Sequence, residues 1–212
     1  LSLSLLVSIP SAAGLFLLSG PLISTIFLGG SFSDYDLMMT DISLRGYSIG
    51  IIGLCMVLVL SPAFYAREDT KTPLRYGLIT LFVNVILSIL FVSYFMNQNS
   101  LYPHLGLALA FSIASITNAG LLFYRLIIDG LIDINQDGLM HILRIALATA
   151  GMIAFLMVFN PENSLWANSA LSERIRSLFF LISLSVVIYF SILFLLGFRF
   201  RDLRVESTSE QL

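Results

Sequence analysis

Charged residues are scarce in this sequence. Only 11% of the 212 residues are Asp, Glu, Lys or Arg, whereas average soluble domains contain about 25%. A water-soluble globule of this size cannot cover its surface with so few charges. The net charge of −2 argues against a basic nucleic-acid-binding protein, and the single cysteine excludes a disulfide scaffold. The sequence also lacks an ATP-binding P-loop pattern and any His, Cys and carboxylate cluster with zinc spacing.

Apolar residues, in contrast, make up 58% of the chain. Six apolar stretches each approach the roughly 20 residues that a helix needs to cross a bilayer. They are Leu3–Leu28, Ile42–Ala63, Leu74–Met96, Leu105–Ile128, His141–Phe159 and Ile175–Phe198. Their even hydrophobicity favours helices over barrel strands, which alternate polar and apolar residues. We therefore predict an all-α, polytopic membrane bundle of six transmembrane helices, the first of them broken or kinked at Pro10 and at Gly20-Pro21.

Basic residues are distributed unevenly between the predicted loops. The segments after the second, fourth and sixth stretches contain Arg67, Lys71, Arg75, Arg125, Arg199, Arg201 and Arg204. The opposite side has Arg45, Arg174 and Arg176. The positive-inside rule then predicts that both ends of the chain lie in the cytoplasm. Because the chain opens inside an apolar run with no Met, we expect it to be a piece of a longer protein.

Small residues at helical spacing predict where helices pack, because helices in lipid associate through close backbone approach. Such faces occur in the second, fourth and fifth stretches, as Gly46, Gly50 and Gly53; Gly106, Ala110, Ala114 and Asn118; and Ala146, Ala150 and Ala154. The sixth stretch is bulky nearly all round, so we expect it at the edge of the bundle.

Three polar residues fall well inside the predicted spans: Asn84, Thr117 and Asn118. Their simplest role is hydrogen bonding between helices, worth about 0.6 kcal/mol each on average. The alternative is contact with an ion or a lipid headgroup. No Asp, Glu or Lys lies near the centre of any span, so no proton relay or charged-substrate site is visible.

The connection between the second and third stretches is the most specific feature. It reads Phe64-Tyr65-Ala66-Arg67-Glu68-Asp69-Thr70-Lys71-Thr72-Pro73. Asp69 and Thr70 are suited to cap the next helix, and Pro73 is tolerated in a first turn. The segment resembles the F-Y-A-x-x-D-T-x-T-P signature of the MurJ (MviN) family of lipid II flippases. Ser19-Gly20-Pro21-Leu22, Tyr47-Ser48-Ile49-Gly50, Asn118-Ala119 and Leu196-Gly197-Phe198 agree with that family in the same order.

The resemblance implies one half of a two-lobed transporter of the MOP superfamily, covering spans nine to fourteen of the family's fourteen. Residues 1–128 would form four helices of the second lobe. Residues 129–204 would form two additional helices with a groove for the lipid tail, and residues 205–212 a disordered cytoplasmic tail. The aromatic side chains expected at that groove are Phe179, Phe180, Phe190 and Phe194.

The resemblance also implies a function, which is to flip lipid-linked peptidoglycan precursor across the bacterial inner membrane by alternating access. Such a protein is not an enzyme and needs no cofactor or bound metal. Sodium or a proton would be the coupling ion. Its partners would be the precursor, membrane lipids and the eight preceding spans, not nucleic acid. The family's cationic cavity residues lie mainly on those absent spans, so we do not expect this chain alone to flip lipid.

Two alternatives remain at this stage. A flippase for another polyprenyl-diphosphate-linked sugar would share the architecture, although it is not expected to carry the signature. A membrane-embedded transferase would need acidic or His residues clustered at one interface. The only candidates for such a cluster are Asp34, Asp36 and Asp41, which we place in the first loop.

Overall fold

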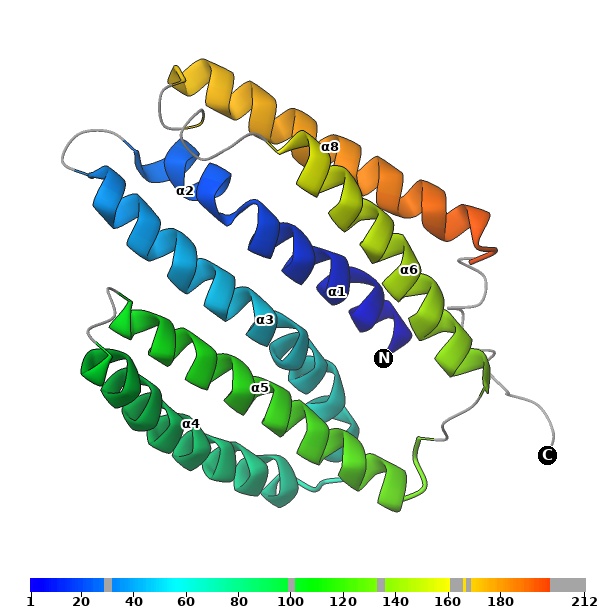
Figure 1. Ribbon diagram of the computed structural model, residues 1–212. Coiled ribbons are helices and arrows are strands. Elements are labelled where there is room, and N and C mark those ends of the chain that lie inside the picture. The colour runs from blue at the N-terminus through cyan, green and yellow to red at the C-terminus, as the bar shows by residue number, and fades with distance from the viewer. Residues whose placement is uncertain (29–31, 99–101, 133–135, 161–165, 167–168, 199–212) are drawn as a thin grey trace.

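Helices account for most of the part of the chain that the structure describes. The computed structural model describes residues 1–28, 32–98, 102–132, 136–160, 166 and 169–198. Its helices are α1 (Ser2–Leu17), α2 (Ser19–Phe27), α3 (Asp34–Tyr65), α4 (Lys71–Asn97), α5 (Pro103–Ile128), α6 (Gln136–Phe159) and α8 (Leu171–Leu195) (Figure 1). Five are long and apolar enough to cross a membrane, and the bent pair α1 and α2, counted as one span, would be a sixth. The predicted all-α membrane bundle is confirmed. The proposed tail, 205–212, and Arg199, Arg201 and Arg204 lie outside the described residues.

The first span is broken rather than gently kinked. The chain bends by 67° between α1 and α2, at Leu18. Pro10 lies within an uninterrupted α1, so the prediction of a break there is wrong. Gly20 and Pro21 lie in the first turn of α2, directly after the bend. Proline is tolerated in a first turn because its missing N–H has no partner there in any case.

Helix α3 begins well before the predicted Ile42. Its N-terminus is fixed by a capping box, in which the Asp36 amide donates to Ser33 Oγ and the Ser33 amide donates to Asp36 Oδ2. Asp34 and Asp36 therefore lie in the first turn of α3, and Asp41 lies inside the helix. The prediction of one acidic loop containing all three residues is wrong.

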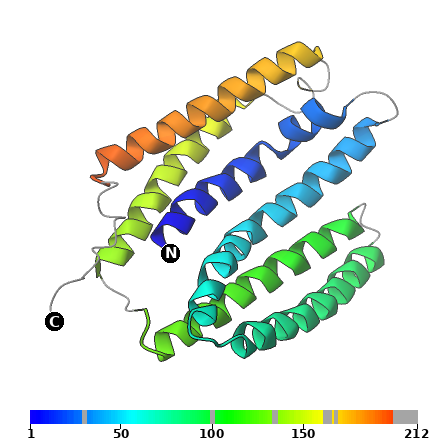
Figure 2. The same ribbon diagram turned by 180° about the vertical axis from the view of Figure 1, so that it is seen from behind.

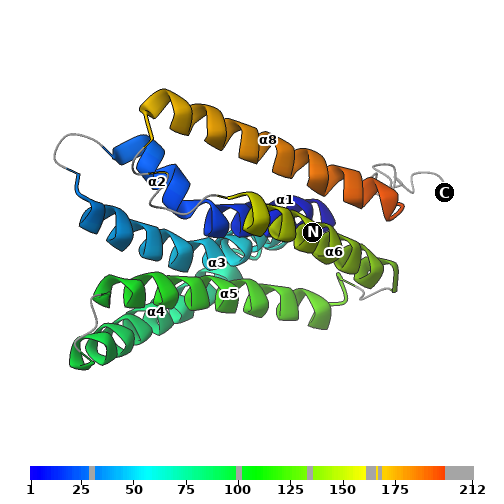
Figure 3. The same ribbon diagram turned by 45° about the horizontal axis from the view of Figure 1, so that its top comes forward.

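The helices lie side by side in an order that differs from their order in the sequence. The contacts run from α4 through α5, α3, α1 and α6 to α8, and α2 touches both α3 and α8. Figures 1 and 2 show this row from its two faces, and Figure 3 shows α4 and α8 at opposite edges. The expected position of the last helix at an edge is confirmed. Helix α1 thus contacts both α3 and α6.

The glycine face of α3 packs against α5, as predicted. A Cβ added at Gly46, Gly50 or Gly53 would lie within 2.8 Å of an α5 atom. The small residues of α5 allow close packing against α4 as well as α3, because an added Cβ at Gly106 would meet the backbone of α4 at 2.9 Å. Ser112 Oγ also donates to the Gly46 carbonyl oxygen at 2.7 Å. Close backbone approach therefore sets the spacing of the α3, α4 and α5 helices.

The alanine face of α6 does not pack as predicted. Ala146, Ala150 and Ala154 are exposed in this structure. The buried side of α6 carries Ile145, Ala148, Met152 and Leu156, which join side chains of α1 and α8 in one apolar cluster. Large side chains fill the space on this side, so the helix axes need no close approach.

Candidate functional site

The signature segment, Phe64–Pro73, lies at one end of the bundle and begins in the protein interior. Phe64 is only 1% exposed and packs in an apolar cluster with Leu60 of α3 and with Leu122 and Leu126 of α5. Tyr65, the next residue, is exposed. The first two signature residues therefore have different roles, because Phe64 anchors the end of α3 to α5 while Tyr65 faces outward.

A tight turn ends α3 inside the signature segment. Glu68 has a φ of 60°, and the Asp69 amide donates to the Phe64 carbonyl oxygen at 3.0 Å. The Glu68 amide donates to the Tyr65 carbonyl oxygen, also at 3.0 Å. Two such bonds around a left-handed residue form a Schellman turn, which satisfies the last helix carbonyls. Helices α5 and α8 end in the same kind of turn, with Gly130 and Gly197 at the left-handed position.

Asp69 caps α4, as predicted. Its Oδ1 accepts a hydrogen bond from the Thr72 amide at 3.0 Å. Hydrogen bonds from the Thr72 side chain and backbone hold the pKa of the Asp69 carboxyl below its usual range. The predicted capping role of Thr70 is wrong, because Thr70 occupies the cap position without a side-chain bond to the helix. Pro73 lies in the first turn of α4, where its missing N–H is tolerated.

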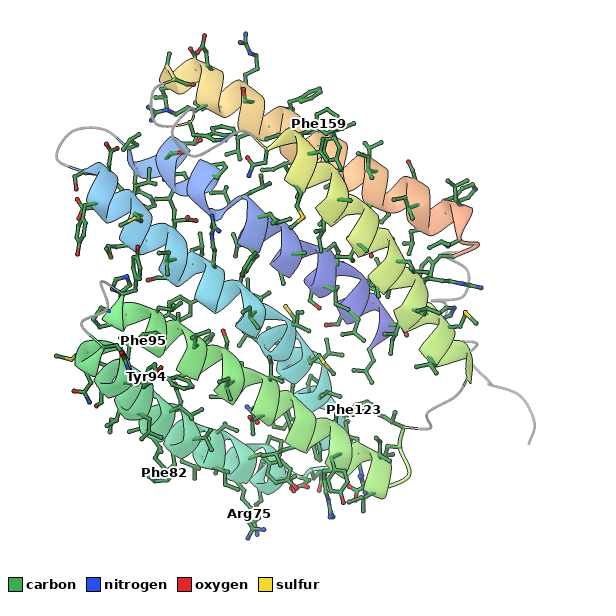
Figure 4. The ribbon with its side chains drawn as sticks, in the orientation of Figure 1. Arg75, Phe82, Tyr94, Phe95, Phe123 and Phe159 are labelled. Atoms are coloured by element: carbon green, nitrogen blue, oxygen red, sulfur yellow. The ribbon has the colours of Figure 1, made fainter. Side chains whose placement is uncertain are left out.

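Arg67 connects the signature segment to the end of α5. It forms an ion pair with Asp129 at 3.0 Å, and Arg125 pairs with the same carboxylate at 3.2 Å. Two guanidinium groups thus share one carboxylate, and the cluster keeps a positive charge. Lys71 and Arg75 are exposed nearby in the sequence, and Figure 4 shows Arg75 projecting away from the bundle. The segment suits the region of anionic lipid headgroups.

The three polar residues predicted inside the spans do not form one site. Asn84 Oδ1 accepts a hydrogen bond from Ser88 Oγ of the same helix at 3.4 Å. Thr117 Oγ1 donates to the Ile113 carbonyl oxygen of its own helix at 2.7 Å. Asn118 Oδ1 is buried and has no hydrogen-bond partner among the described residues. Within the same part of the chain, no three His, Cys, Asp or Glu side chains are placed to hold a metal ion.

A polar cluster that our sequence reasoning missed lies at the α1–α2 bend. Asp41 of α3 is buried and pairs with Arg45 at 2.9 Å. Ser19, the first residue of α2, donates to the same carboxylate and accepts from Arg45 Nε at 3.1 Å. The spacing of four residues between Asp41 and Arg45 was the available signal, since such pairs meet on one helix face.

An apolar groove lies between α1, α6 and α8, with a cavity volume of about 360 Å³. Its lining is almost entirely hydrophobic, as expected for a site that holds hydrocarbon. Of the four Phe residues predicted for a lipid-tail groove, only Phe190 lines this cavity. Phe179, Phe180 and Phe194 are exposed on other parts of α8. Most of the remaining lining comes from α1 and α2, including Pro10, Gly14 and Leu18, and the sequence had not indicated these residues.

The acidic residues needed by a transferase do not converge. The Asp36 carboxylate is engaged by Ser33, and Asp41 pairs with Arg45 further along α3. Asp34 is exposed in the first turn. The described acidic residues at this end therefore cap a helix, neutralise an arginine or face outward, and they do not form a catalytic cluster.

Comparison with known proteins agrees with the signature. Residues 1–194 match the family model described as lipid II flippase MurJ. The chain is 33% identical over 198 residues to a probable lipid II flippase MurJ of Vibrio cholerae, covering 93% of this chain and 36% of that protein. It is 35% identical over 199 residues to a Buchnera aphidicola protein of the same name, covering 94% and 38%.

A third relative is the lipid II flippase MurJ of Burkholderia cenocepacia, which is 29% identical over 206 residues, covering 96% of this chain and 38% of that protein. The chain thus spans between a third and two fifths of the length of these relatives. With its apolar spans, it is part of a multi-pass membrane protein. By the match over residues 1–194, the chain belongs to the lipid II flippase MurJ family.

Proposed function

We propose that this chain is the C-terminal part of a transporter that flips lipid II across the bacterial inner membrane by alternating access. The observation that carries the proposal is the family match over residues 1–194, which includes the signature segment. The protein acts as a transporter, not as an enzyme. The eight spans that precede this segment in the family complete the transporter, and its substrate is the polyprenyl-diphosphate-linked peptidoglycan precursor.

Within this proposal, α1 to α5 (residues 1–128) belong to the second lobe, and α6 with α8 (residues 129–204) is the added helix pair that encloses the lipid-tail groove against α1 and α2. The apolar lining and the volume of about 360 Å³ support this assignment. The groove is partly open, so a polyprenyl chain lies in it with one side toward lipid. Phe190 is the predicted groove residue that contacts the chain.

The basic residues of the signature end support a cytoplasmic position for that end. Arg67, Lys71, Arg75 and Arg125 lie together near the end of α3, the start of α4 and the end of α5. Anionic lipids of the cytoplasmic leaflet attract such residues at about 1 kcal/mol each. Helix α8 runs toward the same end, because Arg144 near the start of α6 donates to the Gly197 carbonyl oxygen. The C-terminus is then cytoplasmic as well.

Asn118 is the intramembrane residue best suited to contact a coupling ion. Its buried amide oxygen has no partner among the described residues, whereas the polar groups of Asn84 and Thr117 bond within their own helices. Hard cations prefer oxygen ligands. Replacing Asn118 by Leu is expected to weaken the sodium dependence of transport, and unchanged dependence would assign the residue to helix packing.

A complementation experiment tests the proposed function. Residues 1–212 are joined to the first eight spans of a curated relative and expressed in cells depleted of their own flippase. Growth is expected if the segment completes a lipid II flippase. A chimera that reaches the membrane in normal amounts but leaves the cells to lyse would refute the assignment.

Two matched variants test the groove in the same chimera. A Cβ at Gly14 or at Gly120 meets no atom within 4 Å, so both positions accept a larger side chain without a clash. Gly14 lines the groove and Gly120 does not. Gly14→Leu is expected to fill the groove and reduce growth, whereas Gly120→Leu leaves growth unchanged. Equal growth of the two variants would show that the groove is not needed for lipid transport.

A further inference from the structure

Pro10 leaves one backbone carbonyl of α1 without its helical partner, and a side chain of another helix supplies the missing donor. In an α-helix each carbonyl accepts a hydrogen bond from the N–H four residues later. Residue 10 has no N–H, so the Leu6 carbonyl loses its partner although α1 continues unbroken. A carbonyl left free in a membrane interior is costly. The hydroxyl of Tyr189, on α8, donates to the Leu6 carbonyl oxygen at 2.8 Å.

A second carbonyl of the same span has a matching arrangement. The Leu17 carbonyl lies at the last residue of α1, where the 67° bend ends the helix, and Pro21, four residues later, has no N–H to offer it. Asn160, at the end of α6, donates its amide Nδ2 to the Leu17 carbonyl oxygen at 3.1 Å. Trp166 Nε1 donates to Asn160 Oδ1 at 3.3 Å and thereby fixes which side of the amide faces Leu17.

These two hydrogen bonds join the same three helices that enclose the groove. Tyr189 and Pro10 both line the cavity, and Leu18 and Leu22, beside the Leu17 carbonyl, line it further along. Tyr189 is only 3% exposed and packs in the apolar cluster shared by α1, α6 and α8. The donors come from the C-terminal helix pair, and both acceptors are backbone atoms of α1. The Tyr189 bond therefore ties α8 to α1, and the Asn160 bond ties the end of α6 to the end of α1.

We propose that Tyr189 and Asn160 are positioning residues that set the width of the groove by holding α8 and α6 to two α1 carbonyls: that of Leu6, which Pro10 leaves without a partner, and that of Leu17, which the end of α1 at the bend leaves without one. We call these two interhelical hydrogen bonds, from Tyr189 and from Asn160, the fastenings. The identity of the lipid in the groove rests on the proposed function, whereas the role of each fastening does not. Each bond joins a side chain to a backbone atom, so a substitution that removes the donor breaks the bond without changing the backbone. Opening the Tyr189 bond lets α8, an edge helix, move away from α1.

A double-mutant cycle in the whole flippase tests the Tyr189 fastening. Tyr189→Phe removes only the hydroxyl and leaves the Leu6 carbonyl without a donor. Pro10→Ala restores an N–H at residue 10, which can bond the Leu6 carbonyl within α1. In the double variant the hydroxyl is therefore no longer needed. Tyr94→Phe serves as the control, because Tyr94 lies exposed on α4, far along the row from the groove.

The readout is the α1–α8 distance, measured between spin labels at Leu3 and Phe194 in a background without other cysteines. Both positions are exposed and lie outside the groove lining. From the typical strength of interhelical hydrogen bonds in membranes, we expect Tyr189→Phe to raise the ratio of molecules with a wide α1–α8 separation to those with a narrow one. The expected rise is about threefold, and at most about fifteenfold. In the Pro10→Ala background the same change is expected to have little effect. Equal effects in both backgrounds, or none in either, would overturn the proposal.

A binding measurement separates positioning from general stability. A fluorescent polyprenyl diphosphate is titrated into the same purified variants, at a temperature at which all of them remain folded. We expect Tyr189→Phe to weaken binding about threefold or more. The double variant with Pro10→Ala should recover the affinity of the parent. Weakened binding without such recovery would assign Tyr189 to ordinary packing and overturn the proposal.

The second fastening has its own conservative variant. Asn160→Asp keeps an oxygen for Trp166 but removes the N–H that Leu17 requires, so it is expected to lengthen the α1–α6 distance and widen the groove on that side. An unchanged distance between spin labels at Phe16 and Phe159, both exposed and outside the groove lining, would overturn the role of Asn160. The distances are measured without lipid II, so they judge the fastening alone. If the distance cycle holds and the chimera fails to sustain growth, the fastening stands and the lipid II assignment falls.

Discussion

Replacing Gly53 by Ala tests whether close backbone approach holds α3 to α5. An added Cβ at Gly53 would lie 2.6 Å from the Ile116 nitrogen and from the Ser115 carbonyl carbon, both of them backbone atoms of α5. A side chain in the way can change rotamer, but a helix backbone cannot. The two helices must therefore separate, or one of them must bend.

The size of the effect follows from this geometry. Ordinary contact begins at about 3.4 Å, so relief of the 2.6 Å contact needs a shift of about 0.8 Å. A gap of that size removes a quarter to a half of the dispersion energy of the neighbouring atom pairs. Overpacking costs typically about 1–3 kcal/mol, and alanine regains about 0.5–1 kcal/mol through its helix propensity. We expect a net loss of about 1–2 kcal/mol in the free energy of unfolding.

SDS titration of the whole flippase in bicelles measures this difference. Gly77→Ala on α4 is the matched control, because its added Cβ meets no atom within 4 Å. The control is expected to be neutral or slightly more stable than the parent. The hydrogen bond from Ser112 Oγ to the Gly46 carbonyl oxygen, at 2.7 Å, should also lengthen in Gly53→Ala. A Gly53→Ala protein as stable as Gly77→Ala would refute the close-approach reasoning.

Two further predictions concern carboxylates at opposite ends of the bundle. Asp41→Asn should lower the free energy of unfolding by about 1–3 kcal/mol in the same SDS titration. The loss is smaller than for a fully buried ion pair because the Arg45 side chain is 39% exposed. Asp34→Asn, at an exposed position, is the control, and equal stability of the two variants would contradict the prediction. The lowered pKa of Asp69 means that its cap on α4 is fully present above the ordinary aspartate pKa and is lost as the pH falls through the lower folded-state value. Hydrogen exchange of the Thr72 amide, corrected for its intrinsic rate, should therefore be faster at pH 3 than at pH 5, and this difference should vanish in Asp69→Ala.

Features set by local sequence were predicted well. The helical spans follow from apolar length, and the cap formed by Asp69 follows from its position before a helix with Pro73 in its first turn. The glycine face of α3 was also readable, because glycine at i, i+4 and i+7 has little use in a membrane helix except close packing. Each of these features depends on residues close together in one helix or turn.

Features that depend on neighbouring helices were predicted poorly. Alanine spacing on α6 resembles a packing face, yet Ala146 and Ala150 are exposed because the adjacent large residues fill the interior. Phe179 and Phe180 are as apolar as Phe190, and only the rotation of α8 against α1 decides which of them lines the groove. The groove itself combines residues of α1 and α2 with residues of α6 and α8, which are far away in the sequence, so no local pattern marks it.

The prolines of the first span show why a locally unfavourable residue is informative. Pro10 and Pro21 both lie in the one span that touches α3 on one side and the C-terminal helix pair on the other. On the first side, Ser19 bonds Asp41 of α3. On the second side, the Leu6 and Leu17 carbonyls accept from Tyr189 and Asn160. A displacement of α3 relative to α8 must therefore bend the α1–α2 span or break one of these bonds. Without Pro10, helix α1 would satisfy the Leu6 carbonyl itself, and the Tyr189 hydroxyl would no longer be needed there.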